Sequence, residues 1–259
     1  MIAHELRVSE EYLLALAQVW EWERLVDEQL DSVIAEEAVE VALQPIYPLG
    51  GTKERPWGYE ALARFPTAPG APVGMWFRAA VASGRALPLE LLCVRKATVA
   101  VEALPADTSL CVNASAVAAG ELRAVVDPDL AARVIVDIPY AVVETPVWSD
   151  VHAGLRAWGM RAAIDDVAPE ALRDLRAGLQ PPYPTFVKVD VVAGLADNGA
   201  ATRELEEAVS WARDNGITVI AERVQQPADL AIVEELGISL AQGYCLGAPP
   251  EPGRHRAAW

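Results

Sequence analysis

The chain has 259 residues, of which 53% are hydrophobic, and 37 acidic against 21 basic side chains give it a formal net charge of −16. A chain of this length and apolar content can bury the core of one barrel-sized domain of about 250 residues. The negative charge argues against polymeric nucleic acid as a partner, because such partners need a basic surface. No apolar run approaches the length of about 18 residues that a membrane span needs.

Residues 1–25 are expected to form an N-terminal helical extension that opens at Ser9–Glu11. Leu16, Val19 and Trp20 contribute to a wide apolar face on this helix. The face could pack on the bottom or side of the main domain, or it could bind a second copy or a protein partner. The N-terminus has no basic leader, so we expect no signal peptide.

Eight short runs of aliphatic and β-branched residues follow, each bounded by turn or helix-start signals, and each is predicted to be a strand. Amphipathic stretches that suit helices lie between most of them, for example 89–104, 202–215 and 227–236. This alternation predicts an α/β fold, a (β/α)8 barrel of the TIM type over residues 26–252, followed by a short tail over 253–259. The predicted strands are Val41–Leu49, Gly58–Phe65, Ser109–Ser115, Arg133–Ile138, Arg161–Val167, Phe186–Asp190, Thr218–Val224 and Leu240–Gly247.

Acidic residues stand at or just after the carboxyl ends of these strands, where a barrel of this type carries its chemistry. A buried ring of acids repels itself unless it takes up protons or binds cations. The ligands are carboxylate and amide oxygens, and no histidine lies near a strand end, so Mg²⁺ or Mn²⁺ fits better than zinc. A cluster that holds two such ions suits attack of hydroxide on a phosphodiester. The acids are Glu60, Asp137, Asp165, Asp166 and Glu222, and the other polar groups are Asn113, Lys188, Asp190 and Gln242.

Short motifs at the strand ends resemble those of the EAL-domain family of cyclic di-GMP phosphodiesterases. Gln44-Pro45-Ile46 and Gly58-Tyr59-Glu60-Ala61-Leu62-Ala63-Arg64 are similar to the opening motif of the family. In the family's order there follow Val112-Asn113-Ala114-Ser115, Asp165-Asp166, Lys188-Val189-Asp190, Ala221-Glu222 and Gln242-Gly243-Tyr244, with Pro249 beyond. The resemblance implies a barrel whose first strand is antiparallel to the second. It also implies binding of cyclic di-GMP across the mouth and hydrolysis to linear pGpG by metal-activated water.

The resemblance further implies a role for each matching residue. Two Mg²⁺ or Mn²⁺ ions would be held by Glu60, Asn113, Asp137, Asp165, Asp166 and Glu222. Catalytic roles fall to Glu60, Lys188, Glu222 and Gln242, of which Lys188 would orient the attacking hydroxide. Substrate-binding roles fall to Gln44, Leu62, Arg64, Asp190 and Pro249.

The chain departs from the family's pattern at supporting positions. Asp137 stands where the family has Glu, and Tyr140 replaces a second acid. The loop 165–170 lacks both of the family's glycines and contains the stiffer Pro169. Residues that orient metal ligands typically contribute about 10–100-fold to affinity or activity, so several such losses together predict either a slow enzyme or a protein that only binds the nucleotide.

Two more departures follow Glu222: Arg223 where the family prefers Gly, and Gln225 in place of a second Glu. Retained metal ligands favour a cyclic di-GMP phosphodiesterase of low activity. The altered positions favour the alternative, an inactive degenerate EAL domain that acts as a cyclic di-GMP receptor or a protein-interaction module. With either function, the N-terminal helix or the loop 165–170 could bind a second copy, giving a homodimer, or a protein partner.

Several candidates also have a purely structural interpretation. The Asp165-Asp166 pair could cap a helix, and Asp137 could satisfy a backbone amide. Tyr244 is expected to pack in the barrel with its hydroxyl exposed. Lys188 lies between two valines of a buried strand and therefore needs a carboxylate partner.

The three cysteines have no spacing that suits zinc or redox chemistry, and they are expected to be buried thiols of a reducing compartment. We therefore expect a cytoplasmic protein. The cysteines are Cys93, Cys111 and Cys245.

Overall fold

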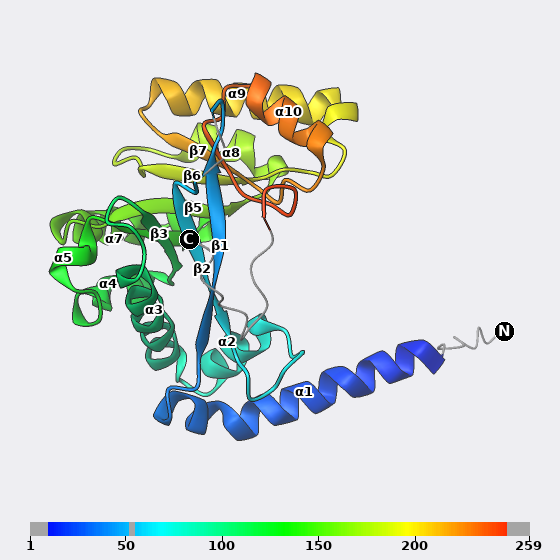
Figure 1. Ribbon diagram of the computed structural model, residues 1–259, viewed down its shortest axis with the longest axis vertical. Coiled ribbons are helices and arrows are strands. Elements are labelled where there is room, and N and C mark those ends of the chain that lie inside the picture. Colours follow the sequence, from blue (N-terminus) through cyan, green and yellow to red (C-terminus); the bar gives the residue numbers. More distant parts are fainter. Residues whose placement is uncertain (1–9, 52–54, 248–259) are drawn as a thin grey trace.

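Eight strands close into a barrel in the order β1 to β8 (Figure 1). The computed structural model describes residues 10–51 and 55–247, with side chains from residue 17 onward. Strand β1 is antiparallel to both β2 and β8, and all other neighbouring strands are parallel, which confirms the expected EAL-type variant of the (β/α)8 barrel. The strands are β1 Glu40–Pro48, β2 Gly58–Arg64, β3 Ser109–Asn113, β4 Val134–Pro139, β5 Arg161–Val167, β6 Phe186–Asp190, β7 Thr218–Glu222 and β8 Leu240–Ala241.

The α-helices of the described chain surround this barrel and form a lobe beside it (Figure 1). They are α1 Glu10–Ala35, α2 Val73–Ala82, α3 Ala86–Glu102, α4 Ala116–Glu121, α5 Pro128–Ala131, α6 Tyr140–Val143, α7 Val147–Ala157, α8 Leu172–Gly178, α9 Gly199–Asp214 and α10 Pro227–Glu235. None of these helices combines the length and the apolar character needed to cross a membrane.

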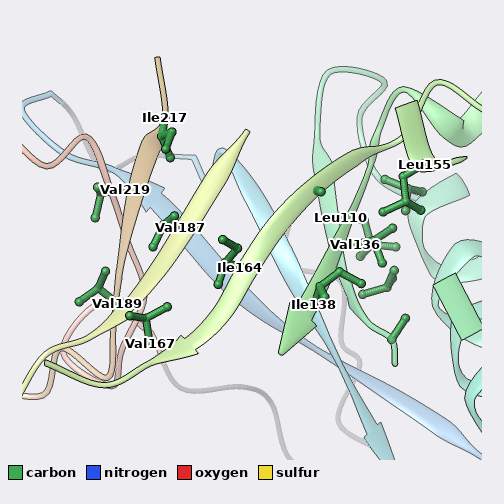
Figure 2. Close-up of a cluster of buried hydrophobic side chains, with 14 of the residues drawn as sticks. Leu110, Val136, Ile138, Leu155, Ile164, Val167, Val187, Val189, Ile217 and Val219 are labelled. Carbon is green, nitrogen blue, oxygen red and sulfur yellow. The ribbon is translucent and has the colours of Figure 1, made fainter. Parts of the chain in front are cut away.

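The outer face of the barrel is covered by aliphatic side chains that pack against the helices. Figure 2 shows Val136, Ile164 and Val187 on the successive strands β4, β5 and β6. They belong to one buried cluster with helix residues such as Leu155 of α7. Strands that pack on this face and also fill the interior are apolar along most of their length, which is why they appear as short continuous apolar runs in the sequence.

The inward-facing side chains form two layers of different character. The lower layer is apolar and consists of Ile46, Cys111, Ile135, Ala163, Phe186, Ile220 and Leu240. Successive residues of a strand point to opposite faces, so the residue two positions further on also points inward. In the parallel strands that residue is Asn113, Asp137, Asp165, Lys188 or Glu222, directly after β8 it is Gln242, and in the antiparallel β1 it is Gln44, two positions before Ile46. Strand alternation therefore places a polar layer directly on an apolar one.

The C-terminal half of helix α1 packs against α2 and α3, and the three helices form the lobe beside the barrel. Val26, Leu30 and Val33 are buried in one cluster with Phe65 and Trp76, whose rings stack at a centroid distance of 4.5 Å. The N-terminal part of α1 extends away from the barrel (Figure 1), where Trp20 is 66% exposed. The helix runs without interruption through residue 25, where the sequence suggested the extension would end.

The eighth strand is shorter than predicted, because it ends at Ala241 and residues 242–247 form a turn. Gly243 has φ 156°, and the amides of Leu246 and Gly247 both donate to its carbonyl at 3.0 Å. A Cβ at this glycine would lie 2.1 Å from the carbonyl oxygen of Val224. The turn thus depends on a backbone conformation and a close approach that only glycine allows.

We expect Gly243→Ala to lower the free energy of unfolding by about 3 kcal/mol or more, because the strained φ and the backbone overlap both act against it. Urea unfolding of the purified variant measures this change. Gly154→Ala is the matched control: Gly154 lies inside α7, and a Cβ added there would meet no other atom within 4 Å, so alanine there should gain about 0.5–1 kcal/mol. Similar unfolding midpoints for the two variants would contradict this account of the turn.

Candidate metal centre at the barrel mouth

Lys188 lies at the centre of the polar layer and is fully buried. Its Nζ is 2.9 Å from Glu222 Oε1, 3.1 Å from Asp137 Oδ2, 3.1 Å from Asp165 Oδ1 and 3.4 Å from Glu60 Oε1. These carboxylates come from β7, β4, β5 and β2, and barrel closure brings them to one point. The sequence predicted one carboxylate partner for the buried lysine, and the structure provides four.

Three of these acids form a group suited to a metal ion. Glu60, Asp137 and Asp165 each offer one carboxylate oxygen, and these oxygens lie within 4.8 Å of one another. Asp137 Oδ1 is buried and has no hydrogen-bond partner among the residues that the structure describes. One lysine charge also leaves most of the surrounding negative charge unbalanced. A hard divalent cation with oxygen ligands fits this arrangement, because it would satisfy the open oxygen and the excess charge together.

Two amide side chains fix the orientation of the acids. Gln242 Nε2 donates to Glu60 Oε2 at 2.6 Å and to Glu222 Oε1 at 2.7 Å. Asn113 Nδ2 donates to Glu60 Oε1 at 3.2 Å. Hydrogen bonds of this kind hold metal ligands in position and tune their affinity. In this structure, therefore, Asn113 supports Glu60 through its amide nitrogen.

Burial changes the protonation behaviour of the cluster. It raises the pKa of Asp137 and of Glu222 well above the ordinary carboxyl values, although the charge of Lys188 opposes the change. Burial by itself lowers the pKa of Lys188, but the combined attraction of the four carboxylates, with Asp137 the strongest, raises it well above its ordinary value. Lys188 therefore stays charged, and without a metal Asp137 and Glu222 retain protons more readily than surface acids do.

Asp137 should make the metal-free protein lose stability as the pH rises. A carboxyl with a raised pKa binds its proton more tightly in the folded state, so its contribution is complete below the ordinary value of 3.8 and is lost as the pH rises through the folded-state pKa. Asp137→Asn removes this titration. From pH 5 to pH 8 in chelator, wild type should lose stability relative to the variant, by at most about 1.4 kcal/mol per pH unit. Urea unfolding at each pH tests this, and parallel curves would contradict it.

Asp166 does not join the cluster, although it follows Asp165 directly. The register between β5 and β6 shifts between Ile164 and Val167, and Asp166 has φ 55°. Its side chain is 71% exposed. Arg223, with φ 56°, places its guanidinium between two acids, with Nε 3.0 Å from Asp190 Oδ1 and Nη2 3.6 Å from Asp166 Oδ1. The mouth therefore holds two separate acidic groups, each with its own basic residue.

Two adjoining cavities open over the cluster. A polar cavity of about 440 Å³ is lined by Glu60, Asp165 and Glu222 together with Gln44 and Arg223. The neighbouring cavity of about 560 Å³ is mostly apolar, and its lining includes Arg64, Val73, Phe77, Cys93 and Ala97. The two cavities share Leu62, Asn113 and Asp166 as lining residues. The residues predicted to bind substrate, Gln44, Leu62 and Arg64, thus border this double cavity, Asp190 holds Arg223, and Pro249 lies outside the described residues.

Some of the cavity lining differs from the sequence-based expectation. Tyr244 was expected to pack in the barrel, but its side chain is 66% exposed and lines the polar cavity, because the turn at Gly243 directs it outward. Glu90 was not anticipated at all. Its Oε2 accepts the backbone amide of Ser115 at 2.7 Å, and it lines the apolar cavity. The available signal was a single acid within the apolar stretch 87–92 of α3.

The sequence matches one protein-family model, and the fold matches several solved structures. The family model described as "EAL domain" matches residues 27–249. The EAL domain of FimX from Xanthomonas citri, solved in complex with c-diGMP, superposes with a TM-score of 0.72 at 17% identity, covering 92% of this chain and 96% of that one. The PaMucR phosphodiesterase in its c-di-GMP complex gives 0.71 at 19% identity, covering 88% and 98%.

A third solved structure has higher sequence identity. BlrP1 from Klebsiella pneumoniae, in a manganese and cy-diGMP complex, gives a TM-score of 0.64 at 28% identity and covers 80% of this chain and 55% of that one. The first two similarities show the fold alone, because their identity is low. No curated protein sequence gave a significant match to the chain.

Proposed function

Because the chain belongs to the EAL domain family, whose model matches residues 27–249, we propose that it binds cyclic di-GMP at the barrel mouth and hydrolyses one phosphodiester to give linear pGpG. The observation that carries this proposal is the convergence of Glu60, Asp137 and Asp165 beside Lys188, below a polar cavity of about 440 Å³. Three carboxylates with a buried cation are the donor set expected for metal-assisted phosphoryl chemistry.

Glu60, Asp137 and Asp165 would hold Mg²⁺ or Mn²⁺. When bound, such an ion supplies an activated water at neutral pH and neutralises charge on the phosphoryl oxygens. Lys188 stays charged and adds a fixed positive centre beside the reacting group. Gln242 keeps Glu60 and Glu222 in place, and Glu222, when ionised, offers a carboxylate to accept the proton that the attacking water loses.

The double cavity suits a molecule with two nucleotides. Gln44 lines the polar cavity and offers a donor and an acceptor to a base edge. Arg64 lines the apolar cavity, where its planar fork suits a phosphate or a guanine edge. Leu62 borders both cavities. A cyclic dinucleotide could therefore place one base in each cavity, with a phosphodiester over the acidic cluster between them.

A receptor without turnover is the second candidate, and one observation favours it. Arg223 already pairs with Asp190 and Asp166, two acids that would otherwise be available at the mouth. If that pairing prevents assembly of a productive centre, the same cavities would bind the nucleotide and leave it intact. The exposed part of α1 around Trp20 would then offer a surface for a protein partner.

Product chromatography separates the two functions. The purified protein is incubated with cyclic di-GMP in Mn²⁺, in Mg²⁺ or in chelator, and the nucleotides are resolved. Metal-dependent formation of pGpG supports the phosphodiesterase. Intact nucleotide that co-elutes with the protein supports the receptor, and intact nucleotide without co-elution contradicts both functions.

A further inference from the structure

Six carboxylates at the barrel mouth divide between two cations. Lys188 contacts four of them, and Arg223 lies near the other two. The first group is buried, whereas the side chains of Arg223 and Asp166 are 63% and 71% exposed. The six acids are Glu60, Asp137, Asp165, Asp166, Asp190 and Glu222.

The two groups differ in what they can still bind. Within the described chain, the group of acids whose oxygens converge for a metal ion is Glu60, Asp137 and Asp165. Among the described residues, Asp137 Oδ1 and Asp190 Oδ1 are both buried without a hydrogen-bond partner, but Asp190 Oδ1 already lies 3.0 Å from the guanidinium Nε of Arg223. Asp166 and Asp190 instead face a guanidinium, and a second divalent ion would have to displace it before it could use them.

The backbone directs Arg223 into this position. Both Arg223 and Asp166 adopt left-handed φ angles, 56° and 55°, which side-chain-bearing residues rarely adopt. The next residue, Val224, is held in place by close packing against Gly243 and by its amide, which donates to the carbonyl of Gln242 at 3.1 Å. The conformation of Arg223 is therefore set by its surroundings.

We propose that Arg223 takes the place of a second divalent ion, so that the mouth binds one metal ion and meets the phosphodiester with a guanidinium. This inference rests on the proposed function. A guanidinium has five N–H donors in a planar fork that matches phosphate oxygens. Two of its nitrogens face Asp190 and Asp166, and the side chain also lines the polar cavity. Arg223 can thus pair with Asp190 and Asp166 and contact a phosphate at the same time.

Counting bound Mn²⁺ tests the proposal. Free Mn²⁺ is followed by electron paramagnetic resonance during titration of wild type, Arg223→Gly and Arg24→Ala. Glycine relieves the left-handed φ, so the first variant should fold. Arg24→Ala removes one charge from an exposed ion pair on α1 and controls for net charge. We expect one ion in wild type and in Arg24→Ala, and two in Arg223→Gly. Two ions in wild type, or one in Arg223→Gly, would overturn the proposal.

Nucleotide affinity in chelator tests the phosphate contact. With no metal present, Arg223→Gly should bind cyclic di-GMP about tenfold more weakly than wild type, because a charge-assisted hydrogen bond is lost. Arg24→Ala should bind like wild type. If Arg223→Gly and wild type bind cyclic di-GMP with equal affinity, Arg223 does not contact the phosphate. If wild type binds neither Mn²⁺ nor cyclic di-GMP, the proposed function is wrong. If wild type hydrolyses cyclic di-GMP and binds two ions, only the proposal about Arg223 is wrong.

Discussion

Lys188→Met should lower the free energy of unfolding of the metal-free protein by about 3–5 kcal/mol, the cost typical of removing one partner from a buried ion pair. The variant leaves four carboxylates around a fully buried position with no compensating charge. Added Mn²⁺ should restore part of the loss, because the ion supplies the missing positive charge. Urea unfolding in chelator and in Mn²⁺ measures both effects.

Lys96→Met is the matched control for this change. Lys96 pairs with Glu37 at 3.5 Å on the surface, where solvent screens an ion pair and leaves it little effect on stability. The surface variant should unfold close to wild type and should not respond to Mn²⁺ more than wild type does. If Lys188→Met is as stable as Lys96→Met in chelator, Lys188 is not the charge that holds the acidic cluster together.

Glu60→Ala should reduce pGpG formation by on the order of 10³-fold or more, because a metal ligand contributes several kcal/mol to stabilisation of the transition state. Glu60 is one of the three convergent acids and also accepts hydrogen bonds from Gln242 and Asn113. The fold should persist, and stability should equal or exceed that of wild type, because one of four mutually repelling buried carboxylates is gone. Turnover assays with circular dichroism melting curves measure both properties.

Glu206→Ala controls for the loss of one acidic side chain, since Glu206 is exposed on α9. It should keep wild-type turnover and Mn²⁺ affinity. Unchanged turnover in Glu60→Ala would show that Glu60 is not a metal ligand needed for hydrolysis. A variant that fails to fold would show instead that Glu60 supports the structure of the barrel.

Local sequence determined the strands of the barrel and the chemistry of its mouth. Short apolar runs bounded by turn signals gave β5 and β6 with the bounds that the structure has. Because strand side chains alternate, the acid or amide two positions after an interior apolar residue also points inward. Glu222 after Ile220 and Asp137 after Ile135 are examples. These features depend on a few neighbouring residues, which is why they can be found without the fold.

The tertiary structure decided which of these groups meet. Asp165 and Asp166 are adjacent in sequence, but a register shift and a left-handed φ send them to different cations. The last predicted strand ends early, at Ala241, and continues as a turn in which Gly243 packs against the backbone of Val224, a residue of another segment. The apolar cavity needs α2 and α3 beside the barrel. Such contacts depend on barrel closure and on backbone atoms far apart in the chain. The sequence therefore determined which chemical groups line the mouth, and packing between distant segments determined how they are paired.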